Sequence, residues 1–160
     1  MATDQYIKAL IVDDEEPARI ALQKLLEWNA PEVEVTGVCS NVDDAIKVIS
    51  KGDIDLVFLD IEMPKKNGFD LLAELDTVDF EVIFVTAYDE FAIRAFDFNA
   101  VDYVLKPVRK SKLIQAVQRA QDKQNTQMDS SHLEALIQNI SVQYPAQGLR
   151  KIALPTSEGY

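Results

Sequence analysis

The chain has 160 residues, of which 48% are hydrophobic and 27% are charged, so it can fold around a core of its own. No apolar run approaches the roughly 20 residues that span a bilayer, no secretory leader pattern opens the sequence, and the single cysteine, Cys39, excludes an internal disulfide, so we expect a cytoplasmic protein. The net charge of −11 argues against direct binding of DNA or anionic lipid, because phosphate groups are bound by lysine and arginine.

Strand-like and helix-like segments alternate along the first 124 residues. Each apolar, β-branched run is followed by a segment with apolar residues at helical spacing. Strands are expected at 6–14, 33–39, 54–60, 81–89 and 100–107, and helices at 17–28, 41–53, 67–76, 90–99 and 108–124. Five such units with continuously apolar strands predict an α/β fold, a doubly wound five-stranded parallel sheet with helices on both faces. Ligands of such sheets bind beyond the carboxyl ends of the strands.

The composition changes after residue 124. The segment 125–148 begins with polar, linker-like residues and contains a short amphipathic helix at about 131–140. A break at Pro145 and Gly148 leads into 149–160, which alternates like the start of a strand. We therefore expect three parts: a first domain at 1–124, a linker at 125–148, and at 149–160 the beginning of a second, truncated domain.

Polar residues stand at the ends of four of the predicted strands. They are Asp13 and Asp14, Asp60, Thr86, and Lys106. If the sheet is parallel, all of these ends project into one crevice. Crowded carboxylates repel one another unless a cation joins them, and hard oxygen ligands suit Mg²⁺.

Carboxylates, Mg²⁺, a hydroxyl group and an ammonium group form a set that stabilises charge on a transferring phosphoryl group. Asp60 is then the natural nucleophile, which would form an aspartyl phosphate. The sharp turn after Asp60 would leave this carboxylate open to a phosphodonor.

Four motifs with matching spacing resemble the receiver domain of bacterial two-component response regulators. They are IVDDE at 11–15, DIEMPKKNG at 60–68, VTA at 85–87 and DYVLKP at 102–107, and the resemblance extends over residues 6–124. It implies a flavodoxin-like (βα)5 receiver fold with strand order 2-1-3-4-5. It also implies a phosphorelay in which a cognate histidine kinase is the phosphodonor.

The resemblance implies a role for each acidic position. Asp60 would accept the phosphoryl group and contribute to the Mg²⁺ site. Asp14 would bind Mg²⁺ directly and Asp13 through water, while the backbone carbonyl of Glu62, rather than its side chain, would be a further ligand.

Further roles follow from the resemblance for residues of the last two strands. Thr86 and Lys106 would contact the phosphoryl oxygens, with the backbone amide of Ala87 nearby. The Lys106–Pro107 peptide bond would be cis. Tyr103 would change rotamer as Thr86 moves, which would couple the chemistry to the outer face.

The last residues carry a second, shorter resemblance. RKIALPTSEGY, at 150–160, is similar to the opening strand of LytTR-type DNA-binding domains. A chain of this type would act as a transcription regulator that binds DNA only through its C-terminal domain. Phosphorylation would promote a homodimer through the face of the fourth helix, fifth strand and fifth helix.

Other interpretations remain open. A stand-alone receiver would act by protein–protein contact alone, and the segments at 131–140 and 149–160 speak against it. Phosphatases with an aspartyl nucleophile typically carry a DxD motif after their first strand, where this chain has DDE. Among structural residues, Trp28 is expected to contact the core from its helix, and Asn99 to tolerate a left-handed backbone.

Overall fold

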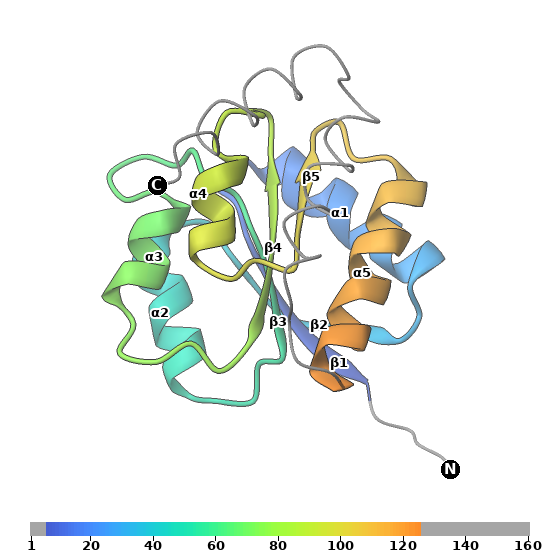
Figure 1. Cartoon of the computed structure of the whole chain (residues 1–160), viewed down its shortest axis with the longest axis horizontal. Coiled ribbons are helices and arrows are strands. Elements are labelled where there is room, and N and C mark those ends of the chain that lie inside the picture. Colours follow the sequence, from blue (N-terminus) through green and yellow to red (C-terminus); the bar gives the residue numbers. More distant parts are fainter. Residues whose placement is uncertain (1–5, 126–160) are drawn as a thin grey trace.

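Five parallel strands form one sheet, and five helices cover its two faces (Figure 1). The structure, a computed structural model, describes residues 6–125. The sheet order is β2-β1-β3-β4-β5, so the predicted doubly wound fold and strand order are confirmed. The elements are β1 (Ile7–Val12), α1 (Glu16–Asn29), β2 (Val33–Cys39), α2 (Val42–Ser50), β3 (Leu56–Leu59), α3 (Gly68–Glu74), β4 (Glu81–Thr86), α4 (Ala92–Asp97), β5 (Asp102–Leu105) and α5 (Lys110–Asn125).

The core consists of two apolar layers, one on each face of the sheet. Helices α2, α3 and α4 cover one face, and α1 and α5 cover the other (Figure 1). Side chains alternate along β1: Leu10 and Val12 belong to the first layer, Ala9 and Ile11 to the second, and all four are buried. Because both faces are covered, the central strands are apolar throughout, which is the pattern that the sequence shows.

Several elements are shorter than predicted: β4 ends at Thr86 rather than at residue 89, and α4 spans Ala92–Asp97 rather than 90–99. The expected turn residues nevertheless lie at element boundaries. The Asn41 side chain caps α2 by accepting a hydrogen bond of 2.8 Å from the Asp44 backbone N–H. Gly52 follows the helix with φ +82°. Asn99, expected to tolerate a left-handed backbone, has φ +62° between α4 and β5. Gly52 precedes β3 and Asn99 precedes β5, which are the strands that lead to Asp60 and Lys106.

The prediction for Trp28 is wrong. Its side chain is 72% exposed, whereas Leu22 and Leu26 are the residues of α1 that are buried. Two residues beyond Leu26, a side chain lies about 200° around the helix and so faces away from the core. The predicted helix at 131–140 and the predicted segment at 149–160 lie outside the described residues. Within residues 6–125, no helix has the length and apolar character required to cross a membrane.

Candidate functional site

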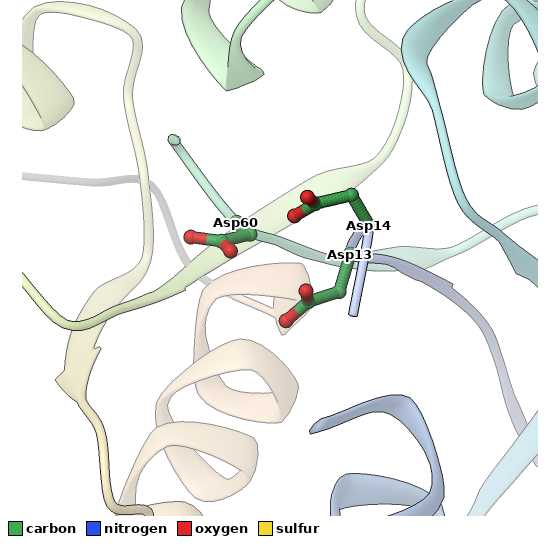
Figure 2. Close-up of side chains that lie close together, drawn as sticks. All are labelled: Asp13, Asp14 and Asp60. Carbon is green, nitrogen blue, oxygen red and sulfur yellow. The ribbon is translucent and has the colours of Figure 1, made fainter. Parts of the chain in front are cut away.

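Three carboxylates meet at the carboxyl edge of the sheet, where β1 and β3 end side by side. Val12 pairs with Leu59 across these strands, and the Asp60 backbone N–H donates a hydrogen bond of 3.0 Å to the Val12 carbonyl. Asp13 and Asp60 are therefore neighbours, and Asp14 follows (Figure 2). One oxygen of each of the three carboxylates lies within 4.8 Å of the others. The structure thus brings together the three acids that the strand ends predicted.

Lys106 provides the positive charge of the cluster. Its Nζ lies 2.8 Å from Asp13 Oδ2 and 3.2 Å from Asp60 Oδ2. The lysine is positioned by the pairing of β5 with β4, because its backbone N–H donates to the Thr86 carbonyl at 2.8 Å. Asp13 and Asp60 are only 5% and 6% exposed, so these ion pairs are poorly screened by solvent.

The electrostatic state of Asp60 follows from its burial. Burial raises the pKa of the Asp60 carboxyl group to about 6, and the nearby charge of Asp13 adds to this shift, while Lys106 opposes it. Burial would lower the pKa of Lys106, but its hydrogen bond to Asp13 and the charges of both acids outweigh this, so that its pKa is raised. The Asp60 carboxyl group therefore has a pKa closer to neutral pH than a free aspartate has, and a further cation nearby would stabilise its charged form.

The side chains of Asp13 and Asp60 are held in place by the backbone that follows each of them. Asp60 Oδ1 accepts a hydrogen bond of 2.7 Å from the Ile61 N–H, and Asp13 Oδ1 accepts one of 2.9 Å from the Glu15 N–H. Each carboxylate is thus fixed by one oxygen, and its other oxygen, Oδ2, faces Lys106.

The turn after Asp60 depends on Gly68, the first residue of α3. Its N–H donates to the Ile61 carbonyl at 2.9 Å. A Cβ at this position would lie 2.4 Å from the Asp60 backbone oxygen. Asn67, the N-cap residue before Gly68, forms a reciprocal capping box with Asp70 at the start of α3. The glycine therefore lets the helix begin directly against the backbone of the buried acid.

The residues at the end of β4 lie beside this cluster. Thr86 is fully buried, and its hydroxyl oxygen accepts a hydrogen bond of 3.4 Å from the Tyr88 N–H. Ala87 is exposed. On β5, Tyr103 is buried against Phe84, and its hydroxyl group donates to the Tyr88 carbonyl. Thr86, on β4, and Tyr103, on β5, are therefore both hydrogen-bonded to the backbone of Tyr88: Thr86 to its N–H and Tyr103 to its carbonyl.

A hollow borders the cluster at Asp14. A hollow of about 520 Å³ opens there between the start of α2, at Ser40–Asp44, and the loop Pro64–Lys66. Asp14 is only half-buried, and the Glu62 side chain is exposed, as suits a residue predicted to act through its backbone carbonyl. The peptide bond between Lys106 and Pro107 is cis.

The donor set fits a hard divalent cation. Asp13, Asp14 and Asp60 offer carboxylate oxygens close enough to share one ion, and these are the ligands that Mg²⁺ prefers. One lysine cannot neutralise three carboxylates, and the charge of Asp13 adds to the burial that raises the pKa of Asp60. Mg²⁺ would supply the missing positive charge.

The motif reasoning missed one residue that contacts the cluster. Arg19, on the first turns of α1, donates from Nη1 to the backbone carbonyl of Asp13 at 2.8 Å. The sequence contains Arg19 in the run EEPAR, but neither hydrophobic spacing nor the strand-end pattern assigns it a contact. The contact joins residues six positions apart in the sequence, and it forms because the turn between β1 and α1 brings the Arg19 side chain near the Asp13 carbonyl.

Comparison with known proteins agrees with this geometry. Residues 9–118 match the response regulator receiver domain family. A response regulatory protein of Vibrio cholerae is 43% identical over 149 residues, covering 92% of this chain and 61% of the relative. The sensory transduction protein LytT of Bacillus cereus is 34% identical, covering 95% of this chain and 60% of that protein. The chain thus spans about three fifths of the length of these relatives.

Solved structures give the same result. The response regulatory domain of mrkE from Klebsiella pneumoniae superposes with a TM-score of 0.67 at 30% identity, covering 75% of this chain and 99% of that one. The receiver domain of AraT, a response regulator from Geobacillus stearothermophilus, gives 0.67 at 26% identity, covering 78% and 100%. Both similarities extend over nearly the whole of a receiver domain.

Proposed function

Because the chain belongs to the response regulator receiver family, we propose that Asp60 accepts a phosphoryl group from a histidine kinase in a magnesium-dependent reaction. The observation that supports this best is the position of Asp60 at the end of β3. The carboxylate is buried, lies beside two further acids, and faces the ammonium group of Lys106. An acid without a functional role would not be expected to lie buried beside two further acids and a lysine.

The proposed chemistry uses the residues already described, together with a magnesium ion. An Asp60 carboxylate oxygen attacks the phosphorus atom of the donor, a bond between that oxygen and phosphorus forms, and the bond from phosphorus to the leaving group breaks. Lys106 and the Thr86 hydroxyl group stabilise charge on the phosphoryl oxygens, with the backbone amide of Ala87 nearby. Burial of Asp60 strengthens these interactions, because little water competes for them.

Asp13, Asp14, Asp60 and the carbonyl of Glu62 would hold the magnesium ion. When bound, it supplies positive charge next to the transferring phosphoryl group. Asp13 and Asp60 are already fixed by the Glu15 and Ile61 backbone N–H groups, so they need little rearrangement to serve as ligands.

The result of phosphorylation would be a switch rather than repeated turnover of a substrate. A phosphoryl group on Asp60 attracts the Thr86 hydroxyl group, and the Tyr88 backbone, which both Thr86 and Tyr103 contact, would transmit the movement. The face formed by α4, β5 and α5 would then favour a homodimer. DNA would be bound only by a C-terminal LytTR-type domain that begins at 149–160, beyond the described residues.

Intact mass spectrometry tests the phosphoacceptor directly. After incubation with a small-molecule phosphodonor and Mg²⁺, the chain is expected to gain the mass of one phosphoryl group, because the Asp60 carboxylate is the proposed nucleophile. Asp60→Asn removes that nucleophile at almost unchanged volume and should abolish the gain. Chelation of Mg²⁺ by EDTA should abolish it as well.

Asp53→Asn is the matched control. Asp53 is an exposed acid before β3, at the opposite edge of the sheet, where it pairs with Lys8. It has φ +72°, a conformation that asparagine accepts. This variant should gain the same mass as the wild type. A phosphoryl group that persists in Asp60→Asn would contradict the proposal. A wild-type chain that neither gains a phosphoryl group nor binds a phosphate mimic such as beryllofluoride would contradict it as well.

The same mimic tests the dimer. With beryllofluoride and Mg²⁺ the chain is expected to sediment as a dimer, since a phosphoryl-like group on Asp60 draws Thr86 inward and alters the α4-β5-α5 face. Asp60→Asn should stay at its original sedimentation coefficient. Wild-type chain that binds the mimic and remains a monomer would show that this receiver signals without self-association.

A further inference from the structure

Arg19 is bonded to the peptide group that joins the first two acids of the site. Its Nη1 donates a hydrogen bond of 2.8 Å to the Asp13 backbone carbonyl, and that carbonyl belongs to the peptide unit between Asp13 and Asp14. Peptide units are planar, so fixing the carbonyl fixes the direction in which the chain leaves Asp13. The orientation of the Asp14 side chain relative to Asp13 depends on this direction.

Two other hydrogen bonds also constrain Asp13, and both are made by atoms other than its backbone carbonyl oxygen. Its N–H donates to the Cys39 carbonyl at 3.1 Å, which aligns the residue with β2. Its Oδ1 accepts the Glu15 N–H, which closes the turn on the side of the carboxylate. The carbonyl is held from a third direction by Arg19, whose own backbone N–H is bonded to Glu15 as part of the first turn of α1.

The start of α1 lacks the usual side-chain cap, and Arg19 connects the helix to the end of β1 instead. Glu15 occupies the N-cap position but makes no side-chain cap hydrogen bond, and Pro17 lies within the first helical turn. The helix is therefore not tied to the end of β1 by an ordinary cap. Arg19 makes that connection instead, and it does so at the carbonyl that separates the two acids.

We propose that Arg19 is a positioning residue for the divalent-cation site, which orients the Asp13–Asp14 peptide so that both carboxylates can serve one ion. This inference rests on the proposed function, because it requires that Asp13 and Asp14 bind Mg²⁺. Groups that orient metal ligands without touching the metal typically change metal affinity about 10- to 100-fold when they are removed. Arg19 also carries a positive charge, which by itself repels a cation. The two effects have opposite signs, so the experiment can separate them.

The test is a calorimetric titration of Mg²⁺ into the unphosphorylated chain. Arg19→Met keeps the length of the aliphatic stem and removes the hydrogen bond, and it should weaken Mg²⁺ binding about tenfold. Arg19→Lys keeps the charge and can donate one hydrogen bond, so it should bind nearly as the wild type does. Lys24→Met is the matched control, since Lys24 lies exposed on the same helix and its loss changes the charge equally.

Each outcome decides the matter. Binding by Arg19→Met that is unchanged or tighter would overturn the inference and leave Arg19 as a structural clamp or a simple repulsive charge. A variant Arg19→Lys as weak as Arg19→Met, or an equal loss in Lys24→Met, would also overturn it. Wild-type chain that binds no Mg²⁺ would overturn the proposed cation site and this inference together. Thermal melting in EDTA verifies that each variant is folded, and Arg19→Leu, which also lacks a donor, replaces Arg19→Met if the latter is not.

Discussion

Gly68→Ala is expected to lower the free energy of unfolding by about 3 kcal/mol, a large effect for a single methyl group. The added Cβ would lie 2.4 Å from the Asp60 carbonyl oxygen and 3.1 Å from the Leu59 side chain. The first of these atoms belongs to the backbone of the buried strand end, which cannot move without displacing the Asp60 carboxylate. Either α3 shifts away, at the expense of buried packing around Phe69 and Leu72, or the acid cluster is distorted.

Urea denaturation in EDTA measures this loss without any contribution from a bound cation. Gly37→Ala provides the matched control, because Gly37 lies in β2 and its Cβ would meet only the ends of the Leu10 and Val48 side chains, at 3.1 and 3.7 Å. Flexible ends can give way, so this variant should lose less than about 1 kcal/mol. Equal losses in the two variants would mean that the approach of Gly68 to Asp60 has no special importance.

The alternation of apolar runs with helical spacing was enough to predict the sheet. The strands β1, β3, β4 and β5 are buried almost throughout, so their composition indicates them, whereas the edge strand β2 alternates buried and exposed residues. The turn positions Gly52 and Asn99 carry residues that tolerate the backbone found there. The strand ends predicted the site for a related reason. In a parallel sheet all carboxyl ends share one edge, so Asp13 and Asp60 had to meet once the register placed Val12 beside Leu59.

Contacts that depend on one side chain crossing a turn were beyond sequence reasoning. Apolar residues lie on more than one side of α1, where Ile20 and Trp28 are exposed, so apolar spacing alone did not show which of them face the core. The hydrogen bond from Arg19 to the Asp13 carbonyl depends on the exact path of the turn after β1. The inward position of Tyr103 likewise depends on the Tyr88 carbonyl, which is not specified by any residue type.

Lys106→Met is expected to lower the free energy of unfolding by about 2 kcal/mol at pH 8 in EDTA. The substitution keeps most of the aliphatic stem and removes the charge that faces Asp13 and Asp60. Breaking a fully buried ion pair from one side costs more, about 3–5 kcal/mol, but the lysine side chain is 21% exposed and Asp60 can relieve the repulsion by taking up a proton.

The dependence on pH gives this prediction a definite sign. The pKa of Asp60 in the folded chain is already raised to about 6, so the acid makes the fold less stable as pH rises from about 4, the value of a free aspartate, through 6. Without Lys106, which lowers that pKa, the decline should continue to higher pH. The difference between wild type and Lys106→Met should therefore widen from pH 5 to pH 8.

Lys8→Met is the control for loss of a lysine. Lys8 pairs with Asp53 at 3.0 Å on the surface, where such pairs contribute little to stability. The change in the free energy of unfolding of this variant should therefore stay small and nearly independent of pH.

Stabilisation by Mg²⁺ offers a second measurement that tests the role of Lys106. If the three acids share one ion, saturating Mg²⁺ should stabilise Lys106→Met more than it stabilises the wild type, since the cation replaces the missing charge at Asp13 and Asp60. Equal stabilisation of both proteins would indicate that Lys106 and the cation act on different groups, and a gap that narrows toward pH 8 would rule out Asp60 as the residue that Lys106 restrains.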